Sequence, residues 1–237
     1  MLFQLEEFLD LPPQYNIAPG QDIYAVRGIV VREENQPDNP TNPNTATASF
    51  NKEVVPLQWG LIPFWSKDPT IGNKMINSRS ETVADKPAFK KAFKTQRCLI
   101  PADGFYEWKK RDDGPKQPYF IYMKDEKPFA LAGIWDKWKN PDGDIIQTCS
   151  ILTTEPNKVV KPIHKRMPVI INPNDFDPWL NPSYEDLEDL KALFKPYDAS
   201  LMTDYPVSIF VNSPNNKGEK CIEEFHEKFK QQKLFPD

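Results

Sequence analysis

Hydrophobic positions in this sequence come mainly as short runs separated by Pro, Gly and Asp. Runs rich in β-branched and aromatic residues lie at positions 98–100, 119–123, 129–135, 147–153, 168–171 and 207–210. Runs of this length, bounded by turn-forming residues, are typical of β-strands. The pattern therefore predicts a sheet or an irregular barrel as the core.

Helical periodicity is confined to two segments. In the first, Asp85 can cap a helix that has Pro87 in its first turn and Phe89, Ala92 and Phe93 on one face. In the second, a capping-box pattern precedes apolar residues at helical spacing, and a proline closes the segment. These residues are, in order, Ser183, Asp186, Leu187, Leu190, Leu193, Phe194 and Pro196. With strands dominant and helices few, the predicted class is α+β.

Length and composition set the expected organisation of the chain. Its 237 residues suffice for one compact domain over 1–237, and the six Trp and 15 Phe are typical of a packed globular protein. Residues 32–49 contain no large apolar group and repeat Pro and Asn. We interpret them as a mobile surface loop of that domain rather than as a boundary.

No targeting or membrane-spanning segment is evident in the sequence. No apolar run approaches the roughly 20 residues of a membrane-spanning helix, and the first residues lack the basic start and cleavage site of a signal peptide. We therefore expect a cytoplasmic protein that does not enter membranes. Cys98, Cys149 and Cys221 are an odd number without CxxC spacing, which predicts reduced thiols in or near the core, without disulfides or a metal site.

Charge is unevenly distributed, although the net charge is only −4. Positions 73–111 hold ten basic residues and only four acidic ones. Such an excess of positive charge can neutralise the phosphates of a polyanion. A solvated helix face explains a charge run equally well. The basic residues are Lys74, Arg79, Lys86, Lys90, Lys91, Lys94, Arg97, Lys109, Lys110 and Arg111.

The chain has two histidines, and they differ in their surroundings. His164 lies between a predicted strand and a turn flanked by prolines, where a loop histidine can shuttle protons. From the residues alone, its structural and functional interpretations are equally supported. His226 lies in a segment rich in Lys and Glu, which we interpret as a C-terminal helix with His226 exposed on its surface.

Two further segments carry candidate chemistry. Glu107 has aromatic neighbours that can desolvate a carboxyl and raise its pKa, but a strand-end Glu that points into water is the simpler interpretation. Residues 59–65 place two Trp around a Gly and a Pro, so Trp65 can stack on an unpaired base or simply join the core. Asn77 and Arg79 suit a sugar hydroxyl and a phosphate. Each feature alone is nonspecific.

The combination of these segments is far more specific. The blocks YNIAPG at 15–20, WGLIP at 59–63, INSRSET at 76–82, CLIPADGFYEW at 98–108 and IHKRMP at 163–168 follow one another in this order. In these five blocks, nearly end to end, the chain resembles the SRAP family, named for its SOS-response-associated peptidase annotation and known for processing abasic sites in DNA.

The resemblance implies a fold, a partner and a set of site residues. The implied fold is a compact α+β domain with a strongly bent, partly barrel-like, mainly antiparallel sheet, a few flanking helices and a positively charged channel for single strands. The implied partner is single-stranded DNA with abasic sites, bound by a monomer without a cofactor. The implied site residues are Asn77, Glu107 and His164 for catalysis, with Arg79 and Arg166 near the DNA backbone and Trp65 for base stacking.

The family's chemistry also requires an N-terminal cysteine, followed by Gly-Arg, that is exposed when the initiator Met is removed. Its α-amine forms a Schiff base with the open-chain aldehyde of the abasic sugar, and its thiol then closes a thiazolidine ring. Here residue 2 is Leu, and the three internal cysteines have no free α-amine. We expect the reading frame to have been started too late, with a natural start of Met-Cys-Gly-Arg.

Three other activities stay open at this point. Without the cysteine, the chain fits a non-covalent module that binds single-stranded DNA. A peptidase or other hydrolase fits the family's historical name, but no Cys or Ser is paired with His164 in the sequence. The Met1 amine alone could support weak lyase cleavage through a Schiff base.

Overall fold

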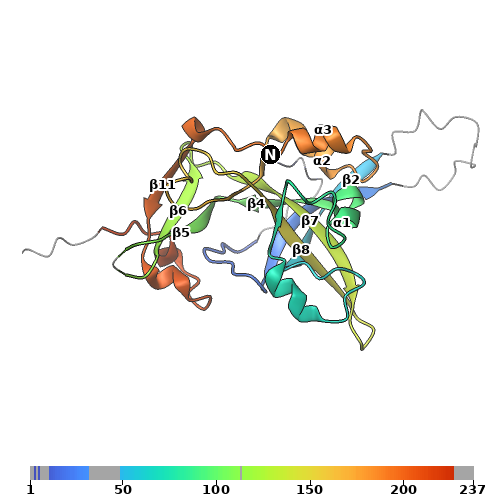
Figure 1. Ribbon diagram of the computed structural model, residues 1–237, viewed down its shortest axis with the longest axis horizontal. Helices are drawn as coiled ribbons and strands as arrows, with labels where there is room; N and C mark the ends of the chain where they lie inside the picture. The colour runs from blue at the N-terminus through green and yellow to red at the C-terminus, as the bar shows by residue number, and fades with distance from the viewer. Residues whose placement is uncertain (1–2, 4, 6–10, 32–48, 113, 227–237) are drawn as a thin grey trace, which may run out of the picture.

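The computed structural model describes residues 3, 5, 11–31, 49–112 and 114–226. Two sheets form the body of the chain, a large one of eight strands and a small one of three (Figure 1). The large sheet bends into a partly closed barrel, and a few short helices flank it. The predicted α+β class is therefore confirmed. Apart from Ser49, the loop predicted at 32–49 lies outside the described residues.

The large sheet has the strand order β10-β7-β4-β1-β2-β8-β3, and β9 pairs with β8. Because β7 also pairs with β8, the path through β4, β1 and β2 closes into a ring. Most pairs are antiparallel, but β2 and β3 run parallel to β8. The strands are β1 Asp22–Val30, β2 Phe50–Trp59, β3 Asn77–Arg79, β4 Arg97–Ala102, β7 Phe129–Lys139, β8 Ile145–Thr154, β9 Met167–Pro168 and β10 Ile170–Ile171.

The small sheet contains β5 Gly104–Lys109, β6 Gln117–Met123 and β11 Met202–Pro206, with β6 in the centre. Successive side chains of a strand point to opposite faces. On the inner face, Phe105 and Ile121 pack into the core that the large sheet also lines. On the outer face, Tyr106, Phe120 and Tyr205 belong to a separate aromatic cluster. The two faces therefore have different neighbours, and the inner one meets the large sheet.

Helices are short and lie at the margins of the sheets. The α-helices are α1 Lys90–Thr95, α2 Phe176–Leu180 and α3 Leu187–Ala192. The 3-10 helices are η1 Pro69–Lys74, η2 Pro173–Asp175, η3 Ala199–Leu201, η4 Ile209–Asn212 and η5 Glu219–Cys221. Trp179 of α2 and Phe93 of α1 are fully buried, and together with Phe194 they cover the outside of β4.

Most predicted elements are confirmed, and five details are corrected. Helix α1 begins at Lys90 with Phe89 at its N-cap, so Asp85 does not cap it and Pro87 lies before its first turn. The strand predicted at 207–210 is wrong, because the Ser208 hydroxyl accepts from the Phe210 amide and starts η4. The run at 168–171 is split into β9 and β10. Helix α3 is capped by Asp186 and not by Ser183, since the Asp186 carboxylate accepts from two amides of the first turn. His226 is exposed as expected but is not helical.

The three cysteines are free and buried, as predicted. Burial raises the pKa of the Cys98 thiol, and it raises that of Cys149 to about 12. Both thiols are therefore protonated and unreactive in the folded chain. Within the described ranges, no helix has the length and apolar character needed to cross a membrane.

Arg97 departs from the expected basic surface, because it is only 2 % exposed. Its guanidinium donates to the backbone carbonyls of Phe93, Lys94, Trp179 and Asn181, so it ties α1 to α2. Burial lowers the pKa of Arg97 to about 10. The other nine basic residues between 73 and 111 are exposed or half-buried, and Arg97 belongs to the structure rather than to a binding surface.

Replacing Arg97 tests this structural role. The substitution Arg97→Met leaves buried carbonyls without donors, so we expect the free energy of unfolding to fall by about 3 kcal/mol or more. Lys94→Met removes the same charge from an exposed neighbour and should change it by less than about 0.5 kcal/mol. Urea unfolding followed by tryptophan fluorescence measures both. Equal effects of the two substitutions would contradict the assignment.

Candidate functional site

Glu107 lies where the inner face of the small sheet leaves the core. Three residues of β5 point to this face in turn: Phe105, which packs against the core, then Glu107, then the exposed Lys109. Tyr119 of β6 stands directly opposite Glu107 and also packs against the core. The side chain of Glu107 is only 20 % exposed. The carboxyl is thus poorly solvated, which the sequence alone did not favour.

His164 is supplied by the loop that leads into β9. Asn157 begins this loop, and its carboxamide oxygen accepts from the amides of Val159 and Val160. The His164 amide in turn donates to the Val160 carbonyl at 2.9 Å, and Ile163 is buried beside it. On the far side, β9 pairs with the end of β8. The loop is therefore fixed at both ends, and His164 projects from it.

The Glu107 and His164 side chains meet between the two sheets. Nδ1 of His164 lies 3.3 Å from Oε1 of Glu107 and 3.1 Å from the Arg166 carbonyl oxygen. The Arg166 amide also approaches Nδ1, at 3.4 Å. One ring nitrogen is thus held by protein groups, while no hydrogen bond to Nε2 occurs among the described residues. With the side chain 46 % exposed, Nε2 can reach a substrate.

Burial raises the pKa of Glu107 to about 7, and nearby His164 and Lys116 oppose the shift. Desolvation disfavours the charged carboxylate, whereas neighbouring cations favour it. A group with a pKa near neutrality can both give and take a proton at physiological pH. The pair therefore combines a carboxyl near its midpoint of ionisation with an imidazole in direct contact.

Arg166 is already engaged by the protein itself. Its guanidinium makes a bidentate ion pair with Glu81, at 2.5 and 2.9 Å, and also donates to the Thr153 carbonyl. The Arg166 hydrogen bond lowers the pKa of Glu81, so this carboxylate stays ionised. Glu81 lies in the sequence block at 76–82, but local sequence gives no sign of its partner, which comes from a distant segment. The pair fixes the backbone that carries His164.

Asn77 and Arg79 lie on the other side of β8 from that backbone. Both are exposed on one face of β3, while Ser78 between them is buried. Arg79 is in register with Thr153, the residue whose carbonyl binds Arg166. In the part of the chain that is described, no hydrogen bond or ion pair joins Asn77 or Arg79 to the Glu107–His164 pair. They lie on β3, which pairs with the same end of β8 as β9 does.

Trp65 lies on a tightly held loop after β2. At its start, the backbones of Gly60 and Gly72 pack so closely that a Cβ on Gly72 would lie 2.7 Å from the Gly60 carbonyl oxygen. Further on, the buried Asp136 accepts from the Phe64 amide at 2.9 Å. Phe64 and Trp65 are each 50 % exposed. The loop therefore presents two aromatic rings to solvent, although none of its polar contacts reaches Glu107 or His164.

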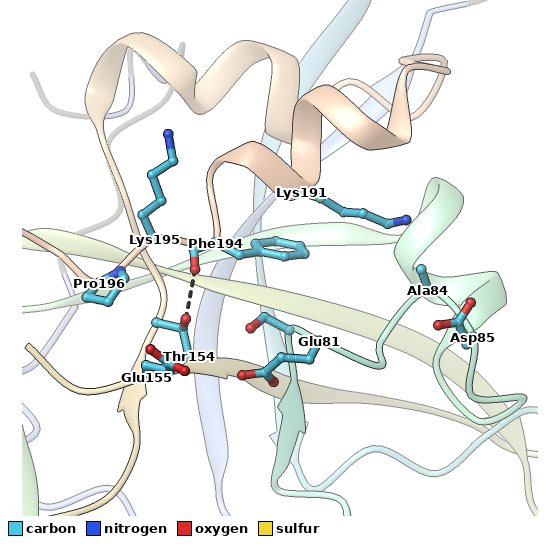
Figure 2. A pocket seen from close by; sticks show the side chains of 10 residues that line it. Glu81, Ala84, Asp85, Thr154, Glu155, Lys191, Phe194, Lys195 and Pro196 are labelled. Atoms are coloured by element: carbon cyan, nitrogen blue, oxygen red, sulfur yellow. Dashed lines mark hydrogen bonds between the residues drawn. The ribbon is translucent and has the colours of Figure 1, made fainter.

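A pocket of about 410 Å³ lies next to Glu81 (Figure 2). Thr154, whose hydroxyl donates to the Phe194 carbonyl at 2.7 Å, lies in its wall. The pocket mixes carboxylates with lysines and does not include Glu107 or His164. Its lining residues are Ser80, Glu81, Ala84, Asp85, Thr154, Glu155, Lys191, Phe194, Lys195 and Pro196. We assign it no part in the chemistry.

Fold and site together define a bent, two-sheet protein with a carboxyl–imidazole pair between the sheets. A family model described as SOS response associated peptidase (SRAP) matches residues 3–214. The chain belongs to this family, and the resemblance found in the five sequence blocks is confirmed.

Two named relatives and one solved structure align with most of this chain. The abasic site processing protein YoqW of Bacillus subtilis is 42% identical over 224 residues, which cover 93% of this chain and 92% of that protein. The abasic site processing protein HMCES of Gallus gallus is 34% identical over 198 residues, or 73% of this chain and 58% of that protein. A crystal structure of a protein from Bacteroides thetaiotaomicron superposes with a TM-score of 0.67 at 34% identity, covering 73% and 77% of the two chains.

The raised pKa of Glu107 predicts a pH-dependent stability. The folded chain holds this proton more tightly than the unfolded chain, so wild-type stability declines as pH rises from about 4.5 to about 7. Glu107→Gln is neutral throughout, and its free energy of unfolding relative to wild type should increase by about 2 kcal/mol between pH 5 and pH 8. Urea unfolding at the two pH values measures the difference.

Glu81→Gln provides the control, because the pKa of Glu81 is shifted in the opposite direction to that of Glu107. Because the pKa of Glu81 is lowered, its carboxylate is already ionised at pH 5, and the stability it contributes is lost only at more acidic pH. The cost of Glu81→Gln should therefore be the same at pH 5 and pH 8. A Glu107→Gln difference that is also independent of pH would show that the Glu107 carboxyl is not desolvated.

Proposed function

We propose that this chain processes abasic sites in single-stranded DNA as part of DNA repair and the SOS response. The observation that carries the proposal is the contact between a poorly solvated carboxyl and an imidazole, Glu107 and His164, at the junction of the sheets. Membership of the SRAP family, and its similarity to abasic site processing proteins, support an abasic site as the substrate. We expect the protein to act as a cytoplasmic monomer.

The proposed reaction is a covalent cross-link through an N-terminal cysteine. Its neutral α-amine adds to the aldehyde of the opened sugar, and loss of water leaves a Schiff base. The thiol then adds its sulfur to the imine carbon while its proton passes to the nitrogen, which closes a thiazolidine. Residue 2 of the sequence is Leu, so the test must supply the cysteine.

Each site residue has a proposed role in this reaction. Glu107, with a pKa of about 7, takes a proton from the amine and returns one to a departing hydroxyl. His164 protonates the ring oxygen to open the sugar, through the nitrogen that faces away from Glu107. Asn77 orients the N-terminal residue with its amide. Arg79 and Arg166 bind phosphates, with Arg166 shared between the strand and Glu81, and Trp65 stacks on a base.

Three other activities differ in their support. Non-covalent binding of single-stranded DNA is the second candidate, because the three internal thiols are buried and position 2 carries no thiol. A Ser- or Cys-dependent peptidase has no such support, since the described contacts of the His164 ring are to Glu107 and Arg166. Lyase cleavage through a terminal amine would give strand breaks without a stable adduct.

A cross-linking assay tests the covalent reaction. The chain is compared with a version prefixed by Met-Cys-Gly-Arg, each incubated with single-stranded DNA that carries one abasic site. We expect a band resistant to denaturation only with the prefix. In the prefixed protein, His164→Gln should slow its formation by about 10²-fold or more, because general acid catalysis is lost, while DNA affinity stays within about twofold. Equal loss of affinity and rate would contradict the role of His164.

Phosphate binding by Arg79 predicts a change in salt dependence. Arg79→Ala should weaken binding of single-stranded DNA and lower the slope of log affinity against log salt by about 0.7, the value for one phosphate contact. Lys127→Ala removes a cation from the turn after β6, where it pairs with Asp125, and should leave the slope unchanged. Fluorescence anisotropy at several salt concentrations gives both slopes. An unchanged slope for Arg79→Ala would remove Arg79 from the interface.

A further inference from the structure

A second pocket, of about 280 Å³, lies beside Glu107 and takes no part in the reaction proposed above. Its walls combine basic and aromatic side chains. The lining residues are Lys109, Arg111, Gln117, Tyr119, Pro206 and Phe225. Basic groups next to aromatic rings are the chemistry that binds single-stranded nucleic acid without reading its sequence.

Strand register makes this pocket a direct continuation of the site. Tyr119 is paired with Glu107, and Gln117 with Lys109, so both pairs project from the inner face of the small sheet. Tyr119 is also paired with Pro206 on the other side. Two residues of a strand span about 7 Å, which places Lys109 that far beyond Glu107 along β5. A neighbouring nucleotide of the same strand can cover this distance.

The wall that carries Phe225 is fixed by backbone hydrogen bonds. The Phe225 amide donates to the Pro206 carbonyl at 2.8 Å, and Val207 forms a β-bridge with Glu224. The Gln117 carboxamide donates to the Val207 carbonyl at 2.8 Å and closes the same corner. The ring of Phe225 is nevertheless 38 % exposed. The pocket is therefore preformed and open, with one ring available for stacking.

The charged groups at the pocket favour an anionic ligand, although one of them is a carboxyl. Lys109 is exposed, and Arg111 lies in the same wall. Asp204 shares the inner face with them, and burial raises its pKa while Lys109 opposes the rise. A phosphate at Lys109 would compete with this single carboxyl. Lys109 opposes this carboxyl, and the ring of Phe225 adds an attraction that an inorganic anion cannot use.

We propose that this pocket binds the nucleotide adjoining the abasic residue, with Lys109 at its phosphate and Phe225 stacked on its base. The proposal rests on the function proposed above and deepens it. It places the path of the DNA on one side of the abasic sugar: from Glu107, the DNA continues along β5 toward Lys109. Stacking on a ring tolerates any base, so the subsite adds affinity without sequence preference.

Three oligonucleotides test the subsite by fluorescence anisotropy. Each carries a tetrahydrofuran abasic analogue, with nucleotides on both sides, on the 5′ side only, or on the 3′ side only. The variants are Lys109→Ala and Phe225→Leu. Lys110→Ala is the matched control, because it removes the same charge from the next, equally exposed residue. Binding is measured with the full chain at fixed salt, and circular dichroism checks that each variant is folded.

The subsite predicts a one-sided loss of affinity. Lys109→Ala and Phe225→Leu should each weaken the two-sided oligonucleotide, and one of the one-sided oligonucleotides, by about five- to tenfold. The other one-sided oligonucleotide should bind them as it binds wild type, and Lys110→Ala should stay within about twofold throughout. The side that is affected identifies the direction of the strand.

Two outcomes would overturn the subsite while leaving the proposed function intact. In one, wild type binds the abasic oligonucleotides and both variants match it on all three. In the other, the variants weaken all three equally, which indicates a general charge or folding effect. If wild type binds none of the three, the proposed function fails, and the subsite fails with it.

Discussion

The desolvation of one carboxyl is the constraint from which the rest of the site follows. Glu107 stands on the face of the small sheet that packs against the large sheet, at the point where the core ends. Water is partly excluded there, so the pKa of Glu107 is raised to about 7, and Nδ1 of His164 lies 3.3 Å from its carboxyl. The chemistry thus depends on how two sheets pack, because neither sheet alone would desolvate this group.

The end of β8 organises the remaining polar groups. β3 and β9 flank it on opposite sides, which brings Arg79 and the segment before β9 to the two edges of one strand. The Thr153 carbonyl accepts from the Ser80 amide on one side and from Arg166 on the other. One backbone group therefore links the edge that carries Arg79 to the segment that carries the histidine.

Sequence patterns predicted the buried strands well and the long-range contacts poorly. β7 is continuously buried from Phe129 to Asp136, so its apolar run is unmistakable. β1 and β2 carry charged residues in mid-strand, and these are stabilised by a cross-strand ion pair of Arg27 with Glu53 that periodicity cannot reveal. The site residues came from motif resemblance. The contact of Glu107 with His164 depends on pairing between distant segments, which no local pattern encodes.

The loop that carries Phe64 and Trp65 has a consequence for the kinetics of association. Its glycine contact, its hydrogen bond to Asp136 and the Lys91 ammonium 4.0 Å from the Phe64 ring fix its conformation before any ligand arrives. A flexible loop would lose conformational entropy on binding, whereas this one has already lost it during folding. In the function proposed above, an unpaired base would meet this surface without any rearrangement of the loop. Diffusion and orientation, rather than a conformational step, would then limit the rate of association.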